Sequence, residues 1–260
     1  MIEVEYYRTL AEEALGRRIA TVGVPDPHCL GDHLTPTGLR RALAGRCFAA
    51  ARRRGKLLLL DTDGPTVGIR FGMSGGLVVD DRLAVDRLLY GPEKFGRQWV
   101  RLRLGFEDGG NLALHDPRRF GRVLVDPDVE ALGPDALGVT VARLDAALAA
   151  RAPGGGPPIK ARLLDQSRLA GVGNLLADEI LWRASLSPWR PSGSLDRPEL
   201  RRLHRALGST LCDLTGRGGS HTGDLMAERR AGGHCPRDGA PLVRDTVGGR
   251  TTWWCPAHQR

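Results

Sequence analysis

The stretch IKARLLDQSRLAGVGNLLADEILWRASLSP, residues 159–188, is the most informative part of the sequence. Its apolar residues predict two helices, and the Gly-Val-Gly-Asn run at 171–174 predicts a tight turn between them. Because the second helix begins at that turn, its first backbone N–H groups and the positive end of its dipole are available to an anion. The pattern predicts a phosphate-binding element, with Lys160 and Asn174 as side-chain donors, although it also fits a plain helix–turn–helix hairpin.

The sequence before this stretch is mostly β in character. Residues 3–16 predict a helix that Gly16 ends, and LTPTGLRRALAG at 34–45 predicts a second short helix. KLLLLDTDGPTVGIRFGM at 56–73 predicts two strands around a DTDGP turn. QWVRLRLGFEDGGNLALHD at 98–116 predicts two more strands around EDGG.

The sequence after about residue 128 is helical until its last segment. Helices are predicted over 141–152, 159–166, 174–184 and 197–215, and the last segment predicts a β-hairpin around a Gly-Gly turn. We therefore expect an α+β multidomain protein. Its expected domains are an N-terminal β-rich domain over 1–130, a helical domain over 131–228 and a terminal hairpin over 229–260.

The composition favours a polyanionic partner. The 260 residues carry a net charge of +8, and the basic residues cluster at 51–56, 116–122 and 197–205. An arginine-rich, high-GC genome would give the same net charge without such a partner. No apolar run approaches the length of a membrane span, and the first residues do not form a signal peptide, so we expect a cytoplasmic protein.

The terminal hairpin has the spacing of a metal site. Cys235-x2-Asp238 and Cys255-x2-His258 stand sixteen residues apart, so that two knuckles can offer four ligands tetrahedrally to zinc. A carboxylate is an unusual second ligand, and His234 is the rival for that place. The spacing predicts a structural Zn²⁺ ion.

Five motifs, in order, give the chain its resemblance to a known family. They are EVE at 3–5, RRRGK at 52–56, GMSG at 72–75, DPRRFG at 116–121, and the helical stretch with its hairpin. With these the chain resembles the formamidopyrimidine-DNA glycosylase and endonuclease VIII family over nearly its whole length. The resemblance implies a two-layered β-sandwich with a leading helix, and a helix–two-turn–helix domain with a zinc finger. It also implies an enzyme that flips a damaged base out of duplex DNA and attacks the deoxyribose C1′ with an amine.

The same resemblance implies roles for single residues. Lys160 and Asn174 match the phosphate contacts, and Arg250 matches the zinc-finger arginine that grips the DNA backbone. A further trio matches the residues that fill the vacated base stack. Arg119, beside this trio, is also expected to bind DNA. Lys56 matches the hairpin lysine near the lesion. The trio is Met73, Arg118 and Phe120. Taken singly, Met73 and Phe120 would be core residues and Arg118 a surface charge.

The first residues depart from the family's pattern. The family usually begins Met-Pro-Glu-Leu-Pro-Glu-Val-Glu, with the proline amine as nucleophile, whereas this sequence begins Met1-Ile2-Glu3. We therefore expect Lys56 or the Met1 amine to replace proline, with Glu3 handling protons. An α-amine has a pKa near 8, so part of it is neutral at physiological pH. The pKa of a lysine is near 10.4 and must be lowered before its amine can act as a nucleophile. The arginines at 52–54 would lower the pKa of Lys56 by like-charge repulsion.

Three functions remain as hypotheses. The first is a base-excision DNA glycosylase, with or without AP lyase activity, and a shortened start could admit bulky or cross-linked adducts. The second is a non-catalytic damaged-DNA binder of the same fold, and the third an unrelated zinc-ribbon nucleic-acid protein. In the first two the partner is damaged double-stranded DNA, and we expect a monomer associated with the nucleoid and not with a membrane.

Overall fold

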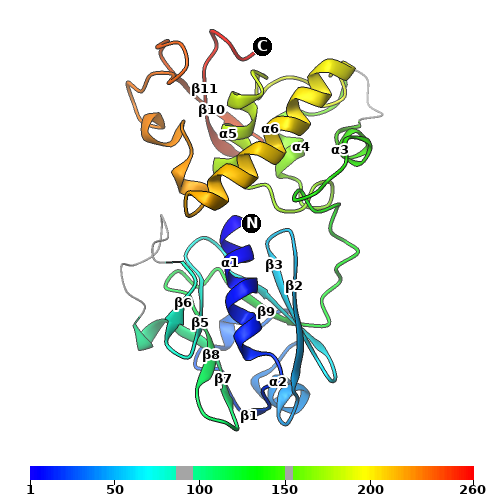
Figure 1. The fold of residues 1–260 in the computed structure, drawn as a ribbon, viewed down its shortest axis with the longest axis vertical. Coiled ribbons are helices and arrows are strands. Elements are labelled where there is room, and N and C mark those ends of the chain that lie inside the picture. The colour runs from blue at the N-terminus through cyan, green and yellow to red at the C-terminus, as the bar shows by residue number, and fades with distance from the viewer. Residues whose placement is uncertain (86–95, 150–154) are drawn as a thin grey trace. The chain divides into compact units, whose positions relative to one another are not determined.

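The computed structural model describes residues 1–85, 96–149 and 155–260, and these form two compact units (Figure 1). One unit comprises Glu3–Val129. The other comprises Glu130–Arg260 together with Met1–Ile2. Among the described helices, none is long and apolar enough to cross a membrane.

The first unit begins with helix α1. It runs over Ile2–Ala11 and continues as a 3-10 turn over Glu12–Ala14, close to the predicted 3–16. Helix α2, Pro36–Leu43, lies where a second short helix was expected. The Thr35 hydroxyl caps it by accepting from the Gly38 N–H, and Pro36 occupies its first turn, where a missing N–H costs nothing.

The described strands of this unit form two antiparallel sheets. One sheet has the order β1-β7-β8-β5-β6 and the other β2-β3-β4-β9. The predicted turns at 61–65 and 107–110 join β3 to β4 and β7 to β8. The strands are β1 Ile19–Gly23, β2 Phe48–Arg54, β3 Leu57–Thr62, β4 Thr66–Arg70, β5 Gly76–Val79, β6 Arg82–Leu83, β7 Val100–Phe106, β8 Asn111–His115 and β9 Arg122–Val125.

Two of the segments that cross from one sheet to the other are placed together by the strand order. Residues 71–75 lead from β4 to β5, and residues 116–121 lead from β8 to β9. β4 and β9 are neighbours in one sheet, and β5 and β8 are neighbours in the other. Both crossing segments therefore connect the same two pairs of strands. The GMSG and DPRRFG motifs therefore lie beside each other although 40 residues separate them in the sequence.

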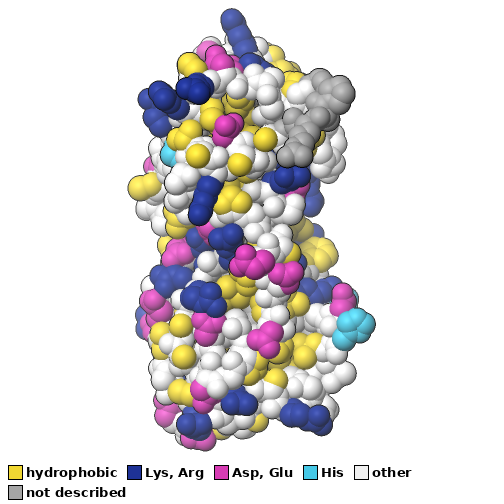
Figure 2. Space-filling model, turned by 90° about the vertical axis from the view of Figure 1, so that its right-hand side faces the viewer, with side chains coloured by type: hydrophobic (Ala, Val, Ile, Leu, Met, Phe, Trp, Pro, Cys, Tyr) yellow, Lys and Arg dark blue, Asp and Glu magenta, His cyan; other side chains and the backbone are white. Residues whose placement is uncertain are grey.

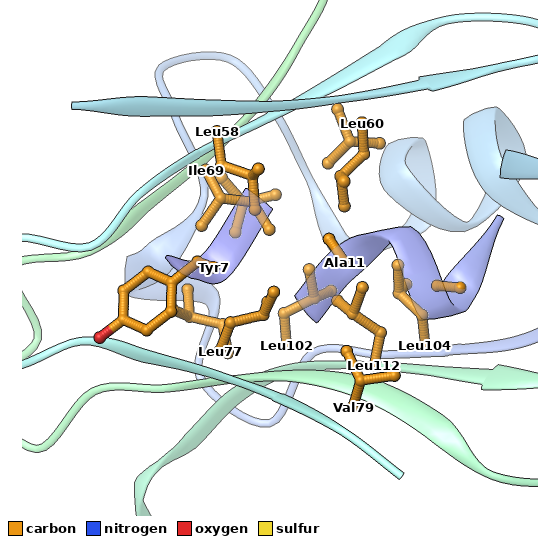
Figure 3. Close-up of a cluster of buried hydrophobic side chains, with 14 of the residues drawn as sticks. Tyr7, Ala11, Leu58, Leu60, Ile69, Leu77, Val79, Leu102, Leu104 and Leu112 are labelled. Carbon is orange, nitrogen blue, oxygen red and sulfur yellow. The ribbon is translucent and has the colours of Figure 1, made fainter. Parts of the chain in front are cut away.

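The core of the first unit encloses α1 between the sheets (Figure 3). Tyr7 and Ala11 of the helix meet leucine and isoleucine side chains from β3 and β4 on one side, and apolar side chains from β5, β7 and β8 on the other. Ala11 is fully buried. A small side chain is needed there because the helix passes between two packed layers.

We predict that Ala11→Leu destabilises this unit. The added methylenes have no room between the sheets, so the free energy of unfolding should fall by about 1–3 kcal/mol. Urea denaturation would measure it. Thr9→Leu introduces the same side chain on the exposed face of α1 and should leave the unfolding free energy nearly unchanged; equal losses in both variants would contradict this account of the core.

The second unit is helical with a terminal hairpin, so the predicted α+β class is confirmed. Its helix α6 starts with a capping box in which Asp196 and Glu199 satisfy each other's backbone N–H groups. Helix α3 ends at Leu148; residues 150–152 of the predicted 141–152 lie outside the described residues. The elements are α3 Val141–Leu148, α4 Ile159–Leu164, α5 Asn174–Arg183, α6 Arg197–Gly216, β10 Val243–Val247 and β11 Arg250–Trp254.

Candidate nucleic-acid interface and metal centre

The two crossing segments present two large apolar side chains to solvent. Met73 is 48% exposed and Phe120 is 51% exposed, so the interpretation of these residues as core is wrong. The Arg118 guanidinium lies over the Phe120 ring, 5.0 Å from its centroid. We call Met73, Arg118 and Phe120 the exposed trio. Its exposed thioether, ring and guanidinium are suited to stacking against bases and hydrogen-bonding to a base edge.

The neighbouring Arg119 points to a different partner. Its backbone is in the left-handed region, with φ of 61°, and its guanidinium binds both carboxylate oxygens of Asp26 at 2.7 and 2.9 Å. This fork lowers the pKa of Asp26. Because Arg119 is held by Asp26, the two consecutive arginines are separated, and only Arg118 accompanies Phe120.

The turn between α4 and α5 is fixed by a side chain that the sequence analysis did not single out. Gln166 donates to the carbonyls of Leu164 and Val172 at 2.9 and 3.0 Å, and its Oε1 accepts from the Gly171 N–H. Gly171 has φ of 115°, which favours glycine. The residue before α5 is Gly173, which has no side chain to cap the helix, and an uncapped first turn is the kind of site that a helix offers to an anion.

Two predicted DNA contacts on this unit differ in their surroundings. Asn174 stands at the start of α5, where its amide nitrogen donates to the Thr251 carbonyl at 2.9 Å. Arg250, the first residue of β11, is exposed. The Asn174 contact therefore joins the helical turn to the hairpin strand that carries Arg250.

Lys160 does not occupy the place expected of a phosphate contact. It is 0% exposed, and its ammonium lies 2.7 Å from the Asp178 carboxylate. The same ammonium donates to the Thr251 carbonyl and the Thr252 hydroxyl at 3.0 and 2.7 Å. Asp178 also binds Arg229. The prediction of Lys160 as a phosphate donor is corrected here: packing of β11 against α4 and α5 encloses the ammonium, which holds the hairpin to the helices instead.

We predict that Lys160→Met lowers stability and that Arg250→Met does not. The first change leaves the buried Asp178 carboxylate with fewer partners, so the free energy of unfolding should fall by about 3 kcal/mol. The second removes an exposed cation and should weaken DNA binding alone. Denaturation curves and binding isotherms for both variants would check this. An unchanged stability in Lys160→Met would show that the buried pair does not hold this unit together.

The hairpin gathers a cluster able to hold a metal ion. The ligand atoms of Cys235, Asp238, Cys255 and His258 all lie within 4.8 Å of one another. Sγ of Cys235 is 3.6 Å from Nδ1 of His258, and Sγ of Cys255 is 3.4 Å from Asp238 Oδ2. Bonds of about 2.0–2.3 Å that meet at tetrahedral angles separate their ends by about 3.3–3.8 Å, and these two separations fall in that range. Nδ1 of His258 and Oδ2 of Asp238 lie closer, at 2.9 Å.

The structure brings Asp238, and not its rival His234, into this cluster. His234 is exposed and uses its backbone N–H to donate to Glu228. Around the cluster, the Trp182 indole donates to Cys235 Sγ at 3.3 Å, and His258 Nε2 lies 3.3 Å from the Trp182 carbonyl. Such outer contacts orient the ligands and hold them for an ion.

We predict that removing the metal lowers the melting temperature of the second unit and that Asp238 contributes to metal affinity. Asp238→Ala should weaken metal binding by about tenfold or more, whereas His234→Ala should bind metal like the native chain. Metal content by mass spectrometry, and thermal unfolding with and without a chelator, would measure both effects. Loss of metal in His234→Ala alone would reverse the assignment.

Of the residues expected to carry the amine chemistry, Glu3 and Lys56 belong to the first unit, and Met1 belongs to the second. Glu3 lies in the first turn of α1, and Lys56 directly follows Gly55 in the turn of the β2–β3 hairpin. Two of the arginines before Lys56 have acidic partners: Arg52 donates to Asp61 at 2.7 Å and Arg53 donates to Glu5 at 2.7 Å. The like-charge repulsion expected from Arg52 and Arg53 is therefore offset by these two carboxylates.

The surface charge is mixed. On the face shown in Figure 2, Lys and Arg side chains are interspersed with acidic ones and do not form one continuous patch. The net charge alone therefore does not mark where a polyanion binds on this face. The exposed trio, the start of α5 and the hairpin are better candidates because each offers a specific contact.

Comparison with known proteins gives matches along the chain. Residues 1–123 match the formamidopyrimidine-DNA glycosylase N-terminal domain, and residues 132–223 match the H2TH domain of that enzyme. The formamidopyrimidine-DNA glycosylase of a Roseiflexus strain is 34% identical over 97% of this chain and 96% of its own length. That of Xanthomonas campestris is also 34% identical, over 97% of this chain and 96% of its own length.

Among solved structures, the MutM (Fpg) protein from Thermus thermophilus is 32% identical, with a TM-score of 0.78 over 100% of this chain and 98% of that one. The two domain matches, in this order, define a class of protein with a sheet domain followed by a helix–two-turn–helix domain. The chain belongs to the formamidopyrimidine-DNA glycosylase family.

Proposed function

We propose that this protein is a DNA glycosylase of base excision repair that removes a damaged base from duplex DNA. The observation that carries the proposal is the exposed trio, in which a thioether and an aromatic ring stand exposed on two adjoining segments and a guanidinium lies over the ring. Met73 and Phe120 would fill the stack that the flipped nucleotide leaves, and Arg118 would hydrogen-bond to the orphaned base. The family's name supports damaged purines as the substrate.

The second unit would hold the lesion-bearing strand. The open first turn of α5 would bind a phosphate through backbone N–H groups, and Arg250 would grip the backbone nearby. We propose Zn²⁺ as the ion of the cluster, because two thiolates, an imidazole and a carboxylate are ligands of that ion. Its contribution would be structural. It would tie together the two ends of the hairpin that carries Arg250.

The chemistry would be carried by an amine. Neutral Lys56, or the Met1 amine, would attack the deoxyribose C1′ while the bond from C1′ to the base nitrogen breaks and the base leaves with a proton. Glu3 would move protons as the sugar ring opens and the amine becomes a Schiff base. If elimination follows, a base would take a proton from C2′ while the bond from C3′ to the phosphate oxygen breaks, and the strand would be nicked.

One observation favours a second candidate, a damaged-DNA binder without catalysis. The pairing of Arg52 with Asp61 and of Arg53 with Glu5 weakens the repulsion that was expected to make Lys56 a better nucleophile. A glycosylase for bulky or cross-linked adducts is a variant of the first function and calls for the same test with a different lesion.

The test is to trap the intermediate. The protein is incubated with duplex DNA that contains an abasic site, borohydride is added, and any covalent adduct is mapped by peptide mass spectrometry. We expect an adduct on Lys56 or on the N-terminal peptide. If Lys56 is the nucleophile, the Lys56→Ala variant should form no adduct. If the Met1 amine is the nucleophile, that variant should still form one. Base release is followed in parallel on duplexes containing a formamidopyrimidine or 8-oxoguanine.

The outcomes separate the candidates. A trapped adduct with base release establishes a glycosylase that uses an amine and identifies the nucleophile, and strand nicking in the absence of borohydride establishes the lyase. Base release without an adduct leaves a glycosylase that uses water. Selective binding to the lesion duplex, with neither release nor adduct, overturns catalysis and leaves the binder.

A further inference from the structure

The two segments that carry the exposed trio meet at a buried carboxylate. Asp116 and Ser74 are both 0% exposed, and the Ser74 hydroxyl donates to Asp116 Oδ1 at 2.9 Å. Ser74 directly follows Met73 in the first crossing segment, and Asp116 begins the second. This hydrogen bond joins the segment that presents Met73 to the segment that presents Arg118 and Phe120.

The same carboxylate also shapes the second segment from within. Asp116 Oδ1 accepts from the Arg118 N–H at 3.2 Å, and Oδ2 accepts from the Gly121 N–H at 2.5 Å. The two backbone groups bracket Phe120, so the carboxylate fixes the loop on both sides of the ring. With Ser74, three donors converge on one buried side chain.

The backbone of Asp116 is held as firmly as its side chain. Its N–H donates to the Trp99 carbonyl at 2.8 Å, and its own carbonyl accepts from Arg101 Nε at 2.8 Å. Both partners belong to the region where β7 begins. The Asp116 carboxylate is therefore held at a fixed position on the five-stranded sheet. Its hydrogen bonds in turn fix the two crossing segments relative to that sheet.

Close packing leaves these segments little freedom. Gly72 has φ of 64°, and a Cβ built there would lie 2.6 Å from the Cβ of Phe120. On the other side of the turn, the Tyr7 hydroxyl donates to the Gly75 carbonyl at 3.1 Å. The first segment thus has a fixed contact at each end, one to the core helix and one to the second segment.

We propose that Asp116 is a positioning residue for insertion into the base stack, acting through Ser74 and through the loop that bears Phe120. The inference rests on the proposed function, because it assumes that the exposed trio enters DNA. A buried acid that accepts three hydrogen bonds in advance spares the trio the entropy of being ordered on the DNA. Asp116 itself touches neither the base nor the sugar.

The test measures insertion directly. The full-length protein is titrated into a duplex that carries a tetrahydrofuran abasic analogue opposite 2-aminopurine, whose fluorescence reports the stacking of the orphaned base. The same analogue in single-stranded DNA, which has no opposite base and no stack to fill, serves as the second substrate. The variants are Asp116→Asn, Ser74→Ala, Met73→Ala and the control Asp126→Asn.

We expect Asp116→Asn and Ser74→Ala each to bind the duplex about tenfold more weakly, with a smaller fluorescence change, and to bind the single strand like the native protein. Ser74→Ala keeps the bonds within the second segment, so it isolates the bond between the segments. Asp126→Asn changes a carboxylate that accepts the Thr66 N–H at 2.8 Å in a turn of the other sheet, and it should match the native protein on both substrates.

The remaining outcomes count against the proposal. Equal losses on duplex and single strand would show a merely structural role for Asp116 and would overturn the inference. Weaker duplex binding by Met73→Ala, with native behaviour in Asp116→Asn and Ser74→Ala, would overturn the inference and leave the proposed function standing. Native duplex binding by Met73→Ala would overturn insertion by the trio, and the inference with it.

Discussion

The strand order of the first unit is the constraint on which its surface depends. Because β4 pairs with β9 and β5 pairs with β8, the connection from β4 to β5 and the connection from β8 to β9 run side by side between the sheets. Neither connection makes a continuous apolar surface alone. Together they bring the segment of Met73 against the segment of Arg118 and Phe120 without any long loop, and the two sheets provide a rigid base.

Both units place a buried acid behind residues for which a DNA contact is predicted. In the first unit Asp116 joins two connections beneath the exposed trio. In the second, Asp178 joins α4, α5 and β11 beneath Asn174 and Arg250, by binding Lys160 and accepting the Trp253 N–H. A buried carboxylate accepts several donors at once, and its desolvation makes each missing donor costly. This arrangement suits surfaces that must keep their shape while they are exposed.

The sequence predicted the helices, four strands of the first unit and the cluster of the hairpin that could hold a metal, because these have local signals. Helices over 159–166 and 174–184 follow from apolar spacing, and the ligand set of the hairpin follows from two x2 pairs. Burial was not predictable in the same way. Lys160 meets Thr251 across 91 positions and Asp116 meets Ser74 across 42, and no local pattern encodes such pairs. A lysine beside a predicted phosphate site was thus assigned to the wrong partner, and Asp116, inside a quoted motif, received no role.

The ion pair of Lys160 with Asp178 bears on how such chains diverge. A lineage that replaces the lysine alone is left with a charge that the fold has enclosed, so exchanges at these two positions must be concerted or must pass through a weakened intermediate. If this lysine is invariant across relatives, the reason would then be the cost of leaving the buried Asp178 carboxylate without its partner. From sequences alone, the same invariance would be taken as evidence that the lysine binds DNA.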